Sequence, residues 1–325
     1  MEAPFLRYSK EIDTDIVQAL EQEMNVHVIE AKKTQGGEFN YSYKVTTDKD
    51  PVIARVFRER NSPLDGKLEW IEDQLSSHHI PHAKMLYYSR KPTFFPYGFM
   101  VSEFLAGTDG KKAIMDGDIS FEEFFDKLAP LLQKVHSIPT VGFGEIRDGR
   151  GEYDTYYDSK RGLYESLRSK LQPLNDVDET THEQVLAYVQ KLQKHSGMFE
   201  SVLLHGDPPP GNSILKPNGE LILIDWDNAK CGSWIDEYVG LVTRGAFMWE
   251  HDLSEKERNK IIQRSFKNHY KGVDFDDPNL IEVMKILEIL NAYGGLVTHY
   301  FQHEDMELYR IAIQRLNSLL AKDNE

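Results

Sequence analysis

The strongest constraint on the fold of this chain lies between residues 202 and 226. Three consecutive prolines, at positions 208 to 210, stand between two short apolar runs of β-type composition, Val202–Leu204 and Leu221–Ile224. A proline fixes its own φ angle and has no backbone N–H to donate, so this stretch suits neither a helix interior nor a central strand. We therefore expect a stiff loop between two short strands, able to hold polar side chains in a fixed geometry.

Oxygen-bearing side chains stand in this loop and directly after the second apolar run. Asp207 and Asn212 lie five residues apart, and Asp225 follows the run. Two carboxylates and an amide oxygen form a set of hard ligands that suits Mg²⁺, whereas Zn²⁺ would need His and Cys. In this interpretation Asn212 and Asp225 hold the metal on a phosphate chain, and Asp207 accepts the proton of an attacking hydroxyl. Phosphoryl transfer requires such an arrangement.

The rest of the chain divides into a β-rich part and a helical part. Strand-like segments occur at residues 41–45, 51–57 and 94–105. One amphipathic helix is expected over residues 64–77, where Leu68, Ile71 and Leu75 recur at helical spacing. Helical signals then follow as capping patterns at Ser120, Thr180 and Ser254 and as long periodic stretches at 279–301 and 304–321. A small β-rich domain followed by a larger helical domain is therefore predicted.

Composition excludes several classes of protein. Among 325 residues, 38 Lys and Arg stand against 53 Asp and Glu, a net charge of −15, which argues against a nucleic-acid binder with its basic footprint. The single cysteine, Cys231, excludes an internal disulfide framework. No apolar run approaches the ~18–20 residues of a membrane span, and the first residues lack the apolar core of a signal peptide. We expect a cytoplasmic protein with neither a nucleic-acid nor a membrane partner, of undetermined oligomeric state.

The loop residues resemble those of a known family. His205, Gly206 and Asp207, then Asn212, then Asp225 before Trp226 are similar to the catalytic and metal-binding segments of the aminoglycoside phosphotransferase/choline kinase-like family. These are small-molecule kinases with the protein-kinase fold, and the resemblance covers roughly residues 30–245. Their loop usually reads His-Gly-Asp-Leu-His-Pro-Gly-Asn, whereas prolines replace the Leu and the second His here. The separation between the aspartate and the asparagine is kept.

The resemblance implies a fold and a domain division. The expected fold class is α+β, a bilobal protein-kinase-like fold. Its N-lobe, residues 1–104, is small, β-rich, carries one helix and covers the nucleotide. Its C-lobe, residues 105–325, is larger and mostly helical, with the catalytic loop, the metal site and the acceptor pocket.

The resemblance also implies a nucleotide site. The binding residues that it predicts are Gly37, Asn40, Arg55, Glu69, Ser102, Glu103 and Phe104. Arg55 takes the place of the family's phosphate-binding Lys or Arg, and a guanidinium can grip phosphate oxygens with two N–H groups. Its acidic partner is less determined, because Glu69 and Glu72 share one helical face; Glu69 is preferred. The base would lie at the segment 102–105.

Three further residues are given supporting roles. Asp236 is similar to the family's aspartate that supports the catalytic loop. His205 is expected to shape this loop by packing and hydrogen bonding, and His136, near a helix end, is expected to be structural.

The predicted activity is a Mg²⁺-dependent transfer of the γ-phosphate of ATP or GTP to a hydroxyl of a small acceptor. The acidic balance favours a cationic acceptor such as an aminoglycoside, hence an antibiotic-resistance enzyme, and the spacing after Gly142-Phe-Gly144 resembles hygromycin-type members. Choline or a sugar is the metabolic alternative. A pseudokinase without turnover is disfavoured because Asp207, Asn212 and Asp225 are all retained. A protein kinase proper is disfavoured because no long activation segment with an A-P-E signature follows Asp225.

Overall fold

The chain separates into two compact units, each made of two stretches of sequence. The computed structural model describes residues 6–34, 40–59, 63–147, 149–174, 176–208, 210–248, 253–302 and 304–321. The first unit comprises Met1–Gly110 and Pro210–Asn228, and the second comprises Lys111–Pro209 and Ala229–Glu325. The predicted division into residues 1–104 and 105–325 is continuous in sequence. The structure differs from it because the segment Pro210–Asn228 joins the first unit.

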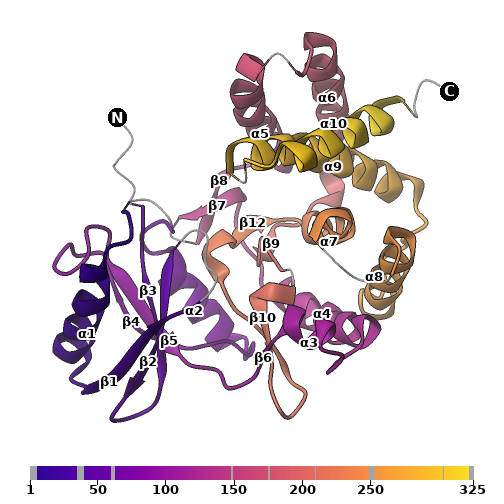
Figure 1. Ribbon diagram of the computed structural model, residues 1–325. Helices are drawn as coiled ribbons and strands as arrows, with labels where there is room; N and C mark the ends of the chain where they lie inside the picture. Colours follow the sequence, from indigo (N-terminus) through magenta and orange to yellow (C-terminus); the bar gives the residue numbers. More distant parts are fainter. Residues whose placement is uncertain are drawn as a thin grey trace. The chain divides into compact units, whose positions relative to one another are not determined.

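A five-stranded antiparallel sheet forms the body of the first unit (Figure 1). Its strands are β1 (Val28–Lys33), β2 (Tyr41–Thr47), β3 (Val52–Val56), β4 (Met85–Ser89) and β5 (Phe99–Glu103), in the order β1-β2-β3-β5-β4. Along β2, the side chains of Tyr41, Tyr43 and Val45 are buried and those between them are not. This alternation is typical of a strand with one face in a core. The strands predicted at 41–45 and 51–57 are confirmed.

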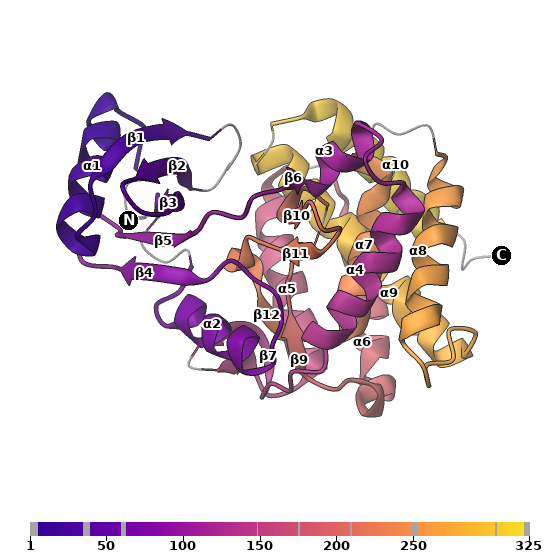
Figure 2. The same ribbon diagram turned by 90° about the horizontal axis from the view of Figure 1, so that it is seen from below.

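Two helices accompany this sheet, where the sequence analysis expected one. The predicted helix is α2 (Lys67–Ser77), and the unpredicted one is α1 (Lys10–Met24), which lies against β1 (Figure 2). The buried side chains of α1 are Ile12, Ile16, Ala19 and Leu20. Their spacing is that of one helical face, so the signal for α1 was present in the sequence. These four side chains join the core formed by β2, β3 and β5.

A small three-stranded sheet brings the second stretch of sequence into the first unit. Its order is β11-β10-β6, from β6 (Thr108–Asp109), β10 (Ser213–Leu215) and β11 (Leu221–Leu223). Strand pairing between β6 and β10 joins segments about a hundred residues apart in the chain. Asn212 immediately precedes β10, and Asp225 follows β11 by one intervening residue. The predicted apolar strand at 221–224 is therefore present and carries Asp225 beyond its end.

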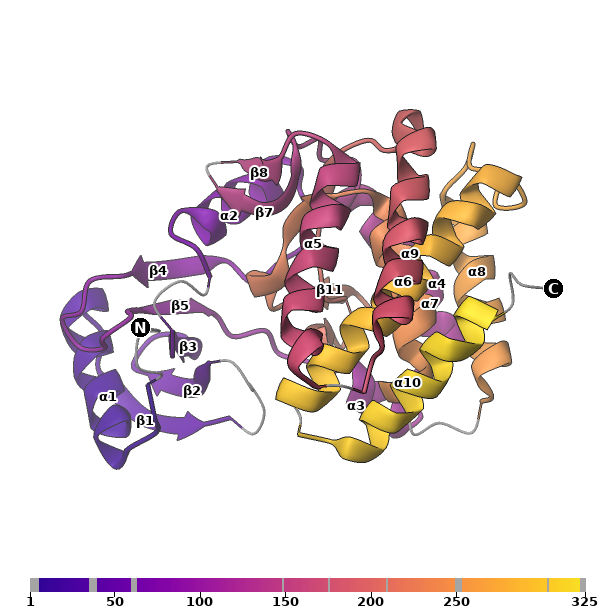
Figure 3. The same cartoon turned by 90° about the horizontal axis from the view of Figure 1, so that it is seen from above.

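The second unit is mainly helical and is built around one long helix, α9 (Pro278–Val297). Its other helices are α3 (Gly110–Met115), α4 (Phe121–Val135), α5 (Tyr156–Leu171), α6 (Glu179–Lys191), α7 (Trp234–Met248), α8 (Glu255–His269) and α10 (Met306–Ala321). Helix α9 contacts α5, α6, α7 and α10 (Figure 3). The capping boxes predicted at Ser120 and Ser254 are confirmed. Helix α6 is capped by Asp178, earlier than the predicted Thr180, and α5 and α7 were not predicted.

A four-stranded sheet completes the second unit. Its order is β8-β7-β12-β9, from β7 (Phe143–Arg147), β8 (Arg150–Tyr153), β9 (Val202–Leu204) and β12 (Lys230–Gly232). Strand β9 matches the predicted apolar run and leads directly to His205. Within the described part of the chain, no helix is long and apolar enough to cross a membrane.

Gly98, in the connection between β4 and β5, should tolerate no side chain. Its φ is +84°, and a Cβ there would lie 2.0 Å from the backbone oxygen of Ser89. Gly117 has a similar φ of +77° with nothing within 4 Å, so Gly117→Ala isolates the cost of the left-handed backbone, about 1–2 kcal/mol. We expect Gly98→Ala to lower the free energy of unfolding, measured in urea, by about 1–3 kcal/mol more than Gly117→Ala does. Equal losses would contradict the contact.

Candidate active site

One cavity in the first unit gathers most of the predicted site residues. It has a volume of about 430 Å³, and every residue that lines it belongs to this unit. The predicted residues among its walls are Arg55, Ser102, Glu103, Phe104, Asn212 and Asp225. A cavity of this size, lined by apolar side chains and a few polar groups, is typical of a small-molecule site.

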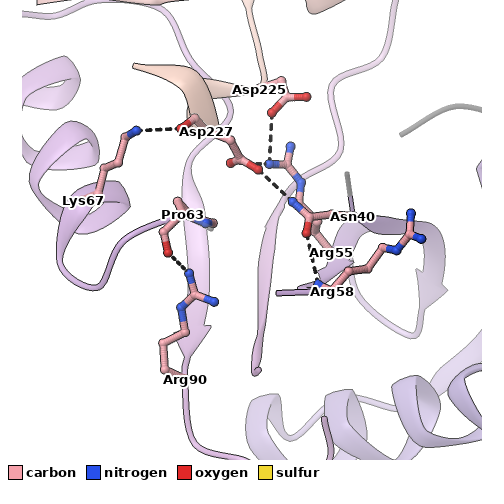
Figure 4. A network of polar contacts seen from close by, with 8 residues as sticks. All are labelled: Asn40, Arg55, Arg58, Pro63, Lys67, Arg90, Asp225 and Asp227. Carbon is pink, nitrogen blue, oxygen red and sulfur yellow. Dashed lines mark hydrogen bonds and ion pairs between the residues drawn. The ribbon is translucent and has the colours of Figure 1, made fainter. Parts of the chain in front are cut away.

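Strand β3 places Arg55 in the cavity wall. Val52, Ala54 and Val56 of this strand are buried in the core, so Arg55 projects from the opposite face. Its Nη1 lies 2.7 Å from Oδ1 of Asp227 and 3.2 Å from Oδ1 of Asp225 (Figure 4). Burial acts to lower the pKa of Arg55, but the two carboxylates outweigh it and raise the pKa. The guanidinium is therefore a permanent cation in this wall.

Asp227 is the acidic partner that the sequence analysis missed. Besides Arg55, it binds Asn40, whose Nδ2 donates to Oδ2 of Asp227 over 2.8 Å. The backbone oxygen of Asp227 accepts from Nζ of Lys67 over 2.7 Å. Burial raises the pKa of the Asp227 carboxyl, and the charge of Arg55 opposes this rise. The signal in the sequence was a second aspartate two positions after Asp225.

Asn212 and Asp225 are linked through their backbones. The carbonyl oxygen of Asn212 accepts a hydrogen bond of 2.9 Å from the N–H of Ile224, next to Asp225. Asp225 has a φ of +65°, in the left-handed region that costs an ordinary residue about 1–3 kcal/mol. Its side chain is 43% exposed, against 13% for Asp227. The backbone therefore holds Asp225 in a strained conformation beside the cavity that it lines.

The donor set of this pair fits Mg²⁺. One carboxylate and one amide oxygen line the same cavity, and Mg²⁺ commonly binds one or two carboxylates while keeping waters and phosphate ligands. Within the described ranges, no three residues of the His, Cys, Asp and Glu types form a group that could hold a metal. That Asn212 and Asp225 ligate Mg²⁺ therefore stays a prediction. The chemistry of their donor atoms is consistent with it.

The segment predicted to hold the nucleotide base follows β5. Ser102 is paired with Ile53 of β3 in the antiparallel register. The backbone N–H of Glu103 donates to the oxygen of Lys84 over 2.9 Å, so this group is already engaged. Nζ of Lys44 lies 3.9 Å from the centre of the Phe104 ring. Backbone groups beyond Glu103 are therefore better candidates for contacts with a base than its own N–H.

Glu69 and Asn40, also predicted for the nucleotide site, do not line the cavity. Gly37, a third such residue, falls outside the described chain. Among the described residues Arg55 pairs with Asp225 and Asp227 and forms no ion pair with Glu69 or Glu72. Glu72 instead binds Nε2 of His82 at 3.0 Å. Asn40 contacts Asp227.

In the second unit, a buried network holds the backbone next to Asp207. The N–H of Gly206 donates to Oε1 of Glu237, and Oε2 of Glu237 lies 2.7 Å from Nε2 of His136. The other ring nitrogen of His136 lies 2.6 Å from the hydroxyl of Tyr270. Burial acts to raise the pKa of Glu237, but the hydrogen bond and charge of His136 outweigh it and keep the pKa below its usual value. Glu237 is thus an ionised anchor for the loop.

The support for this loop comes from Glu237 and not from the predicted Asp236. Asp236 binds Nζ of Lys160 at 2.5 Å and accepts from the hydroxyl of Tyr156 over 2.8 Å. Successive residues on an α-helix point about 100° apart, so the neighbouring side chain faces other partners. His205 is fully buried, as its predicted structural role requires. Asp207 is half-buried in the second unit, and its convergence with Asn212 and Asp225 stays a prediction.

Several solved structures share the fold of this chain. It resembles aminoglycoside phosphotransferase APH(4)-Ia (14% identity, 95% of this chain and 98% of that one, TM-score 0.69). It also resembles a mutant of aminoglycoside 2'-phosphotransferase-IIIa in complex with GDP (15%, 96% and 98%, 0.64) and choline kinase LicA from Streptococcus pneumoniae (18%, 94% and 98%, 0.63). These likenesses confirm the predicted α+β, protein-kinase-like fold. A comparison with the curated proteins finds no match.

The family itself is shown by the sequence. The model of the phosphotransferase enzyme family matches residues 30–275, so this chain belongs to that family. The predicted family and enzyme class, a phosphotransferase with an alcohol group as acceptor, are confirmed.

The network around Glu237 leads to a prediction about acid stability. Because the folded-state pKa of Glu237 is lowered, its contribution is complete above about pH 4.5, its usual pKa, and is lost as pH falls through the lower value. We expect Glu237→Gln to lower the free energy of unfolding at pH 7 by about 1–3 kcal/mol and to flatten its fall in acid. Urea titrations from pH 7 to about pH 3 would measure both effects.

The matched control for this prediction is Glu183→Gln. Glu183 is an exposed glutamate of α6, and its substitution should leave the free energy of unfolding unchanged at every pH. A Glu237→Gln protein whose pH dependence matches that of the parent would contradict the assignment of Glu237 as an ionised anchor.

Proposed function

We propose that this phosphotransferase is a Mg²⁺-dependent small-molecule kinase, which transfers the γ-phosphate of ATP or GTP to a hydroxyl of a small acceptor. One observation carries the proposal: Arg55, Asn212 and Asp225 line the same cavity as the segment 102–105. A phosphate-binding cation and two metal-binding oxygens thus share a space with the segment predicted to hold the base. These are the components that phosphoryl transfer needs besides a base for the acceptor.

Each residue has a defined task in this proposal. Ser102, Glu103 and Phe104 hold the base, and Arg55 holds phosphate oxygens. Asn212 and Asp225 hold Mg²⁺, which when bound neutralises charge on the phosphates. Asp207 orients the acceptor hydroxyl and takes its proton as the acceptor oxygen bonds to the γ-phosphorus. The bond from that phosphorus to the bridging oxygen breaks, and the nucleoside diphosphate leaves.

The acceptor proposed here is cationic. The chain carries a net charge of −15, which attracts positively charged molecules. Among the similar structures, one is a ternary complex of APH(4)-Ia with AMP-PNP and hygromycin B, and another is a choline kinase. An aminoglycoside, and with it a role in antibiotic resistance, is therefore the first candidate, and choline is the second. A GDP complex among these structures keeps GTP as a candidate donor. The cytoplasmic location stays a prediction.

Asp207→Asn should abolish most of the transfer without changing the fold. The amide keeps the shape of the side chain but cannot accept the proton, and general-base catalysis typically contributes ~10²–10⁴-fold. We expect kcat to fall by this factor while nucleotide affinity is unchanged. The measurement is nucleoside diphosphate release with Mg²⁺ and ATP or GTP, across aminoglycosides, choline, sugars and a generic peptide. Asp118→Asn, at an exposed aspartate, is the control that should keep full activity.

Four outcomes would contradict this function. Turnover with the peptide alone would assign the chain to the protein kinases. Nucleotide binding without turnover on any acceptor would favour the pseudokinase alternative. Full activity of Asp207→Asn, or full activity in excess EDTA, would remove the proposed base or the proposed metal.

A further inference from the structure

We propose that Asp227 is a positioning residue for the phosphate donor, which acts by holding the guanidinium of Arg55. This inference rests on the proposed function, because it assigns Arg55 to the phosphates. In protein kinases the equivalent cation is held by a glutamate of the helix that follows its strand. Here the structure gives that part to a residue two positions after the proposed metal ligand Asp225.

The geometry of Arg55 leaves one side of its fork for a ligand. Both carboxylates contact Nη1, at 2.7 Å for Asp227 and 3.2 Å for Asp225. A guanidinium carries five N–H groups, and within the described chain Nε and Nη2 have no protein partner. Arg55 lines the cavity and is only 17% exposed. Carboxylates at one end of the fork therefore orient its remaining N–H groups, which are the groups that can grip phosphate oxygens.

Of the two carboxylates, Asp227 is the better anchor. It makes the shorter contact, and its side chain is 13% exposed against 43% for Asp225. Its second oxygen accepts from Asn40 over 2.8 Å, so both oxygens have partners and the carboxylate has one orientation. A charged hydrogen bond gains strength where water is excluded. Asp225, by contrast, is the residue proposed to bind Mg²⁺, so Arg55 needs a partner that the metal does not claim.

Asp227 also joins three segments that surround the proposed phosphates. Asn40 directly precedes β2, Arg55 belongs to β3, and Lys67 begins α2. Lys67 is 1% exposed, and its Nζ donates to the backbone oxygen of Asp227. The first turn of α2 therefore reaches this site through a lysine and a carbonyl.

A double-mutant cycle tests whether Asp227 acts through Arg55. Wild type, Asp227→Ala, Arg55→Met and the double variant are titrated with ADP, GDP, adenosine and guanosine in EDTA, up to millimolar ligand. Hydrogen bonds to charged groups are worth about 1.5–3 kcal/mol, or ~10–160-fold. We expect Asp227→Ala to weaken diphosphate binding by this factor in the wild-type background and by less than about twofold with Met at 55. Nucleoside affinity should not change, since no phosphate is present.

The controls separate this role from general damage to the fold. Asp13→Ala also removes one carboxylate from the first unit, where Asp13 accepts from the hydroxyl of Tyr43 over 2.8 Å, and it should leave diphosphate affinity unchanged. Asp227→Asn, which keeps the shape of the side chain, replaces Asp227→Ala if that variant does not fold. Urea unfolding of all variants gives their stabilities.

The inference fails in three ways that leave the proposed function standing. An equal loss with Met at 55 would show that Asp227 does not act through Arg55. A loss that appears only when Mg²⁺ is added would assign Asp227 to the metal. Unchanged diphosphate affinity would show no role in binding. The titrations are repeated with excess Mg²⁺, and if wild type binds no nucleoside diphosphate with Mg²⁺ either, the proposed function fails instead.

Discussion

The ion pair between Arg55 and Asp227 is the interaction on which the arrangement of the first unit's cavity depends. A guanidinium that is 17% exposed beside a carboxylate that is 13% exposed has lost most of its water. Removing one partner of such a pair would leave an uncompensated charge, at a cost of about 3–5 kcal/mol for fully buried pairs. The pair therefore holds the end of the segment Pro210–Asn228 against β3. Together with the strand pairing of β10, that contact limits where Asn212 and Asp225 can lie.

Strand pairing and charged contacts together bring a stretch late in the sequence into the first unit. Strand β10 pairs with β6 and β11, and Asp227 bonds to Asn40, Arg55 and Lys67. Backbone pairing sets the position of the segment, and the charged contacts set its side chains. A single boundary in the sequence cannot describe such a unit. The sequence analysis predicted a single boundary because strand pairing between distant segments leaves no mark in local composition.

The sequence predicts a feature well when that feature depends on residues close together in the chain. Local patterns such as the capping boxes at Ser120 and Ser254 and the alternation along β2 were confirmed, since they depend on neighbouring residues alone. The motif around Asp207 and Asp225 identified the family for the same reason. The predicted partner of Arg55, Glu69, was wrong because helical spacing does not show which acid lies nearest to the guanidinium in the folded chain, and the structure places Asp227 and Asp225 there. Helix α1 was missed although its apolar spacing was present.

Asp236 was predicted to support the loop that carries Asp207, whereas Glu237 does so, and the reason applies to both units. In each unit, a carboxylate that is mostly shielded from water holds an element of the proposed site: Glu237 holds the backbone at Gly206, next to Asp207, and Asp227 holds Arg55. A sequence motif identifies the reacting residue, because the chemistry requires one residue type at a fixed distance in sequence from the other residues of the motif. A supporting carboxylate needs only to reach its partner, so Asp and Glu can both serve and the position can shift by one or two residues. Geometry is what separates Glu237 from Asp236 and Asp227 from Glu69.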